Sequence, residues 1–159
     1  PAAFFEVDRV ILQATPPSID PRNFTVNGGD TLLRPLQRTA NVTFTLRNLA
    51  GAGRPLDINE IGFRLQDANG RNLNSYITGV QQVAGVAQLT PSATTPFEYQ
   101  VTFAGDLPVG KVRLGAYALY QDSPTPLAFP YINDSLGSIE LTVADPNDPA
   151  FAIAGWIVR

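Results

Sequence analysis

The stretch NVTFTLRN, residues 41–48, decides the fold. Val42, Phe44 and Leu46 alternate with two threonines and an arginine, so every second residue is apolar. A period of two residues is typical of a β-strand that has one face in a core and the other face in solvent. We therefore predict a strand here, with the three apolar side chains buried.

The same alternation recurs in both directions from this stretch. It appears in residues 4–14 (FFEVDRVILQA), 58–66, 97–103, 112–120 and 138–143, and turn signals such as Asn69-Gly70 separate the segments. The strand at 112–120 has apolar residues on both faces, whereas residues 81–88 leave a single helical turn open. Six or seven short strands without a sustained helical pattern predict an all-β protein, an antiparallel two-sheet sandwich, with a small barrel as the competing architecture. We expect these side chains between the sheets: Phe44, Phe63, Val101, Phe103, Leu114 and Leu141.

Composition removes several functional classes. The 159 residues fit one domain, and the net charge of −3 argues against a nucleic-acid surface. No apolar run approaches the roughly 18 residues that a membrane helix needs. The chain has no Cys and no His, which excludes structural zinc, thiol catalysis and Ser-His-Asp hydrolysis. Its carboxylates fall mostly on the outward faces of predicted strands, so we expect no enzyme and no cofactor.

The last ten residues, AFAIAGWIVR, follow a proline-rich break, DPNDP at 145–149. We therefore divide the chain into a sandwich with its N-terminal strand, residues 1–145, and a hinge with an apolar C-terminal strand, residues 146–159. An apolar segment beyond the last strand of a domain returns to its own core or belongs in another subunit. We predict that one terminal segment pairs with the sheet of an adjacent copy, through these residues: Phe4, Phe5, Val7, Phe151, Ile153, Trp156 and Ile157.

Three segments carry a resemblance to a known class of module. Residues 41–48 resemble a V-x-F-x-L-x-N second strand, 107–120 a P-x-G-x-Y turn with an aromatic sixth strand, and 139–143 a closing strand. Together they are similar to the Ig-like β-sandwich modules of bacterial and archaeal cell-surface proteins. Phe63 stands where a tryptophan is expected in that class, and the insert between Asn69 and Pro96 is long. The terminal segments resemble those of pilus-like filament subunits that donate a strand to a neighbour, which implies an extracellular or cell-surface location.

Few residues suggest a binding site. Asp145, Asn147 and Asp148 could hold calcium at the hinge, although such acidic linkers are usually only linkers. Residues 67–72 match the start of a calcium loop but have Arg71 at a ligand position, so we read them as a hairpin turn. Asn23 and Asn133 open N-x-S/T patterns in predicted loops and are candidate glycosylation sites, whereas the Asn41 pattern opens a strand. The loop residues Tyr76 and Tyr131 leave a sugar-binding surface open.

Two functions follow from these observations. The first is a non-catalytic subunit of an extracellular filament or pilus, a homopolymer built head to tail by donor-strand exchange. The second is an Ig-like stalk or adhesion module of a larger secreted or surface protein, with carbohydrate binding as one role. Residues 41–48 support the fold common to both, and the terminal segments favour the first.

Overall fold

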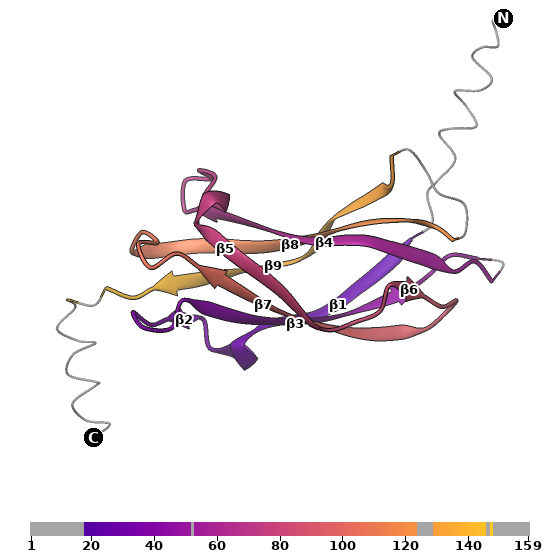
Figure 1. Cartoon of the computed structure of the whole chain (residues 1–159), viewed down its shortest axis with the longest axis horizontal. Helices are drawn as coiled ribbons and strands as arrows, with labels where there is room; N and C mark the ends of the chain where they lie inside the picture. The colour runs from indigo at the N-terminus through magenta and orange to yellow at the C-terminus, as the bar shows by residue number, and fades with distance from the viewer. Residues whose placement is uncertain (1–17, 52, 124–128, 146, 148–159) are drawn as a thin grey trace, which may run out of the picture.

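Two β-sheets stack face to face in the protein (Figure 1). The structure is a computed structural model that describes residues 18–51, 53–123, 129–145 and 147. One sheet has the strand order β1-β3-β7-β5, and the other has the order β2-β9-β8-β4-β6. The strands are β1 (Ile19–Val26), β2 (Leu32–Leu33), β3 (Thr39–Asn48), β4 (Leu56–Asp67), β5 (Ile77–Ala84), β6 (Gln88–Leu89), β7 (Thr94–Phe103), β8 (Gly110–Asp122) and β9 (Tyr131–Val143), with short 3-10 turns η1 (Asn27–Gly29) and η2 (Asn74–Tyr76).

Seven strands follow the order of an immunoglobulin constant-type domain. The sheet β1-β3-β7-β5 corresponds to A-B-E-D, and β9-β8-β4 corresponds to G-F-C in the facing sheet. The predicted all-β, Ig-like two-sheet sandwich is therefore confirmed. One detail differs: β2 runs parallel to β9, so the second sheet is mixed rather than purely antiparallel.

The core lies where the alternation places it. All six predicted core side chains are buried, and Phe63 of β4 is among them. Phe44 stacks on Phe97 and Tyr99 of the neighbouring strand, with ring centroids 5.5 and 6.1 Å away. Phe63 meets Tyr99 edge to face across the sandwich at 5.5 Å, so a phenylalanine occupies the place where the family resemblance led us to expect a tryptophan.

Other predictions meet the structure differently. The strand at 112–120 lies within β8, with its inner face buried and Gly115, Tyr117 and Leu119 half-buried. Residues 67–72 form the predicted turn, in which Asp67 accepts the amide hydrogens of Asn69 and Arg71. Residues 81–88 belong to β5 and β6 and their connection, not to a helical turn. The predicted strand at 4–14 lies outside the described residues.

The chain enters and leaves the sandwich at opposite ends. Ile19 of β1 pairs with Asn48, and Tyr131 of β9 pairs with Tyr120, near the end that we call the Ser18 end. Val143 pairs with Gly110 at the other end, the Val143 end. The 13 residues of β9 run from one end to the other, a length of about 40 Å at the usual rise of a strand. In the described part of the chain, no helix is long and apolar enough to cross a bilayer.

Candidate functional site

The predicted donor residues lie outside the described ranges. These are Phe4, Phe5, Val7, Phe151, Ile153, Trp156 and Ile157. The structure therefore leaves them as a prediction, and it informs on the surfaces that could receive them.

The hinge residues form a turn where they are described. The amide of Asn147 donates to Asp145 Oδ1 at 2.9 Å, the side-chain-to-backbone bond of an Asx turn. Asp148 lies outside the described residues. Within the described ranges no three His, Cys, Asp or Glu side chains gather as metal ligands would. Calcium binding at the hinge stays a prediction.

The candidate glycosylation and sugar-binding residues are dispersed. Asn23 has a left-handed backbone, with φ at 61°, at an irregularity of β1, and Asn133 accepts the amide hydrogen of Ser135. The Asn41 amide donates to Glu98 at 2.9 Å. Tyr76 follows β4 at the Val143 end, whereas Tyr131 begins β9 at the Ser18 end. The two tyrosines therefore do not form one sugar-binding surface.

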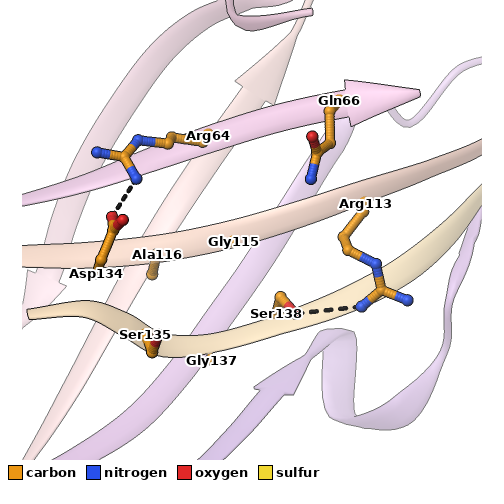
Figure 2. A pocket seen from close by; sticks show the side chains of 9 residues that line it. All are labelled: Arg64, Gln66, Arg113, Gly115, Ala116, Asp134, Ser135, Gly137 and Ser138. Carbon is orange, nitrogen blue, oxygen red and sulfur yellow. Dashed lines mark hydrogen bonds and ion pairs between the residues drawn. The ribbon is translucent and has the colours of Figure 1, made fainter. Parts of the chain in front are cut away.

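A groove of about 260 Å³ lies on the outer face of β4, β8 and β9 (Figure 2). Arg64 of β4 forms an ion pair with Asp134 of β9, and Arg113 of β8 donates to the Ser138 hydroxyl at 3.1 Å. Cross-strand polar pairs of this kind are common on the solvent face of a sheet. Asp134 is the one carboxylate among the described residues that line the groove, whereas glycoside hydrolysis requires two.

Tyr117 lies beside this groove and is covered on several sides. Its hydroxyl donates to Glu60 at 2.9 Å, and the Arg64 guanidinium lies 4.4 Å from the ring centroid. A side chain at Gly62 would collide with the ring, so Tyr117 packs directly on that glycine. Burial, and then the bond to Glu60, raise the pKa of the Tyr117 phenol. The Tyr117 ring is therefore packed against Gly62 and Arg64 and is not a free aromatic surface.

Four strands lie at sheet edges, and they differ in how they are protected. β2 and β6 have two residues each. β1 contains Pro21 and the charged pair Asp20 and Arg22, and its pairing with β3 shifts register between Arg22 and Thr25. β5 has eight residues, ITGVQQVA, with no proline and no charge. Short length, charge, proline and bulges are the features that keep an edge from pairing with another chain, and β5 has only the bulges in its pairing with β7.

The core-facing side of β5 is only partly covered. Val80 pairs with Val101 of β7, and cross-strand partners share a face of the sheet. Val101 is fully buried, yet Val80 is 48% exposed. The second sheet therefore does not extend over this edge. Val83 on the same strand and Val86, which follows the strand, are also exposed, and we call the unpaired side of β5 with these three valines the β5 edge.

The opposite side of the sandwich is closed. Phe24 of β1 occupies the space where a side chain at Gly137 of β9 would lie, and its ring stacks on Phe44 with centroids 6.3 Å apart. The sandwich therefore has one closed side and one open side.

At each end of the sandwich, one polar side chain bonds to several backbone groups. At the Ser18 end, Asn48 is 1% exposed; its amide donates to the carbonyls of Arg54 and Leu89, and its oxygen accepts from Ala50. At the Val143 end, the Arg38 guanidinium donates to the carbonyls of Leu33, Arg34 and Ala144. Arg38 therefore holds the point where the chain leaves β9, and Asn48 holds the segment that follows β3 at the Ser18 end.

Sequence reasoning missed the β5 edge, although a signal was present. No charged residue occurs between Arg71 and Glu98. Strands that are open to solvent normally carry charges, so a long uncharged segment with several valines could have identified this exposed apolar edge.

Comparison with known proteins does not place the chain in a family. No family model and no curated protein matches it. Solved structures with a similar chain path include the putative ApaA protein of Bordetella pertussis (17% identity, 84% of this chain and 98% of that one, TM-score 0.40). Another is AggA, the major subunit of aggregative adherence fimbriae type I of Escherichia coli (15%, 81% and 95%, TM-score 0.38). A third is the cupredoxin domain of amoB from Nitrosocaldus yellowstonii (10%, 82% and 90%, TM-score 0.37).

Proposed function

We propose that the chain is a non-catalytic structural subunit of an extracellular filament, whose copies join head to tail through a terminal segment that pairs with a neighbour. The observation that carries this proposal is that the chain enters and leaves the sandwich at opposite ends. The segment before one end contains the apolar residues Phe4, Phe5 and Val7, and the segment after the other contains Phe151, Ile153 and Ile157. A copy that contributes a segment at one end and receives one along its side makes a head-to-tail contact, which builds an open filament unless the rotation closes a ring.

The described residues also indicate how the joining strand is received. β9 pairs with β8 along its length, so the closing strand of the sandwich comes from the same chain. The described strands thus form a two-sheet core from one chain. A donated segment would therefore add to a sheet edge by β-augmentation, in which backbone groups pair and alternate side chains occupy surface pockets. Burial of three or four apolar side chains would contribute roughly 5–10 kcal/mol before the cost of ordering the segment.

A structural role also agrees with the polar side chains of the described surface. The groove of Figure 2 holds an ion pair and an arginine-serine hydrogen bond. General acid-base catalysis needs a titratable group within reach of the substrate, usually with a second group beside it. The arrangement favours a stable outer face over a reaction centre.

The test is assembly of the purified chain and of two truncations. Electron microscopy and sedimentation would compare the intact chain with chains that lack residues 1–10 or 149–159. We expect filaments from the intact chain and monomers from one truncation, with circular dichroism and melting temperature close to those of the intact chain. An intact chain that stays monomeric, or two truncations that both form the same polymer, would contradict the proposal.

Entry and exit at opposite ends also suit a module in a row of domains, so a stalk or adhesion module is the second candidate. Successive domains in such a stalk are joined by the covalent chain and need no strand exchange. The two functions differ in the purified protein: a stalk module remains monomeric at every concentration, whereas a filament subunit polymerises above a threshold concentration.

A further inference from the structure

We propose that residues 150–158 of one copy pair in antiparallel orientation with the outer edge of β5 in the next copy. This inference rests on the proposed filament function and names both the donor segment and the acceptor edge. The occupant is a second copy of this chain, identified by an uncharged segment that matches an uncharged edge.

The first argument is the comparison of the free edges. β1 has a proline, a charge pair and a register shift, and β2 and β6 are too short to template a strand. The parts of β4 and β9 that have no partner strand on one side carry Glu60, Arg64, Asp134 and Glu140. An added strand would have to remove water from these charges, which is unfavourable. At β5 it meets no charge.

The second argument is the apolar surface that an added strand would cover. The side chain of Val80 lies on the core-facing side of its sheet, but the second sheet does not extend far enough to bury it. Val83 is 56% exposed on the same strand. A strand beside β5 would place alternate side chains over this open side of the sandwich, so Val80 would become more buried on assembly, and Val83 would lie beside the added strand.

The third argument concerns which terminal segment fits. Residues 150–158 (AFAIAGWIV) contain no charge, whereas residues 2–10 contain Glu6, Asp8 and Arg9. Paired with β5, the N-terminal segment would place three charges along a strip of valine, glycine and glutamine. The C-terminal segment would place Phe151, Ile153 and Ile157 there, on one face if the alternation holds.

The fourth argument is direction and reach. β5 begins at the Val143 end, where Ile77 pairs with Phe103, and runs toward the Ser18 end. A neighbour stacked on the Ser18 end would send its C-terminal segment along β5 in the opposite direction, which is the antiparallel arrangement. The nine residues 150–158 are about as long as the eight residues of β5. The six residues 144–149 connect β9 to this segment and can span at most about 20 Å.

The first experiment places a charge on the proposed acceptor edge. Val83→Lys is compared with Val109→Lys, because Val83 and Val109 are 56% and 57% exposed and both changes are tolerable in a monomer. We expect the amount of sedimentable polymer to fall by about tenfold or more with Val83→Lys, since its ammonium would lose water beside an uncharged strand without gaining a partner. Val109→Lys should polymerise like the parent. Circular dichroism would show that both variants fold.

The second experiment identifies the contacting residues. The chain has no cysteine, so introduced thiols report one contact each. Copies with Val83→Cys are mixed with copies of a different mass that carry Ile153→Cys, and the polymer is treated with a short thiol crosslinker. We expect the mixed dimer on denaturing gels. Arg22→Cys on the β1 edge, mixed in the same way, should give none.

The outcomes separate this inference from the proposed function. Filaments that survive Val83→Lys and crosslink through Arg22→Cys would overturn β5 as the acceptor and leave the filament function standing. Crosslinks between two Val83→Cys copies would show that β5 pairs with β5, which would also overturn the inference. Crosslinks from a cysteine in residues 2–10 would show that the other terminus is the donor. A parent chain that never polymerises contradicts the filament function itself.

Discussion

Asn48 is the buried polar residue on which the Ser18 end depends. It ends the NVTFTLRN stretch, and its side chain makes three hydrogen bonds to backbone groups, two through the amide and one through the oxygen. These bonds hold the segment after β3 against Leu89 of β6. A buried amide is stable in a core only when its donors and acceptor are satisfied, and here all are.

We therefore expect Asn48→Ala to lower the free energy of unfolding by about 2–4 kcal/mol, because it leaves buried carbonyl and amide groups without partners. Urea denaturation measures this change. The matched control is Asn72→Ala, which removes one exposed bond to the amide of Asn74 and should cost less than about 1 kcal/mol. Equal losses in the two variants would contradict the structural role assigned to Asn48.

We predict that Tyr99 makes the free energy of unfolding depend on pH in the alkaline range. Burial raises the pKa of the Tyr99 phenol to about 12, above the ordinary value near 10. Between these two values the unfolded chain loses the proton that the folded chain keeps, so the unfolded chain binds fewer protons and stability falls as pH rises. Below about pH 10 both states are protonated and the full contribution is present.

We expect the free energy of unfolding to drop between about pH 8 and about pH 11, and Tyr99→Phe to reduce that drop. Urea denaturation of both proteins at the two pH values is the measurement. Part of the drop remains in the variant, because burial also raises the pKa of Tyr117 and Tyr120. A variant whose stability falls as steeply as that of the parent would show that Tyr99 does not titrate as proposed.

At the scale of elements, the short parallel strand β2 secures the point where the chain leaves the sandwich. Thr142 and Ala144 donate their amides to Thr31 and Leu33, each at 2.9 Å. Two residues make a weak strand by themselves, and the Arg38 guanidinium strengthens the join by binding carbonyls on both segments. A firm attachment here would transmit a defined direction to whatever follows residue 145.

Arg38→Leu should accordingly speed hydrogen exchange at the amides of Thr142 and Ala144, while the amides of β3 and β7 stay protected, because local opening follows the least stabilised element. Exchange followed by mass spectrometry or NMR measures this. Arg34→Leu is the control, since Arg34 is exposed and pairs with the nearby Asp30. Uniformly faster exchange in Arg38→Leu would indicate a global loss of stability instead.

At the scale of the whole molecule, the proposed contact between copies is apolar. The β5 edge and residues 150–158 contain no charge, so association draws on buried apolar area and backbone pairing. Salt screens charge interactions and leaves such contacts largely unchanged. No charged residue belongs to β5, whereas the groove in Figure 2 on the other sheet contains Arg64, Arg113 and Asp134.

We therefore expect filament assembly to change little between about 0.1 M and about 1 M NaCl, although the Debye length falls from about 10 Å to about 3 Å over that range. Sedimentation of the intact chain across the series is the measurement. Filaments that dissolve as salt rises would show that ion pairs, and not the β5 edge, hold the copies together.

The sequence by itself determined the fold class and most of the core. Strict alternation in β3, β7 and β8 assigns each side chain to a face, since a strand has a period of two residues and one face must be buried. Phe44, Val101 and Leu114 were placed correctly for this reason. The absence of Cys and His likewise limited the chemistry without any structure.

Only the tertiary structure decided where the open side of the sandwich lies. β1 was missed because Pro21 and Asn23 interrupt its pattern, and β5 was missed because few of its residues are buried, so no alternation marks it. Whether Val80 is covered depends on how far the second sheet extends, which is a property of strands distant in the sequence. Alternation in the sequence shows which face of a strand is buried. The exposure of an edge strand depends on which other strands the fold places beside it and over it.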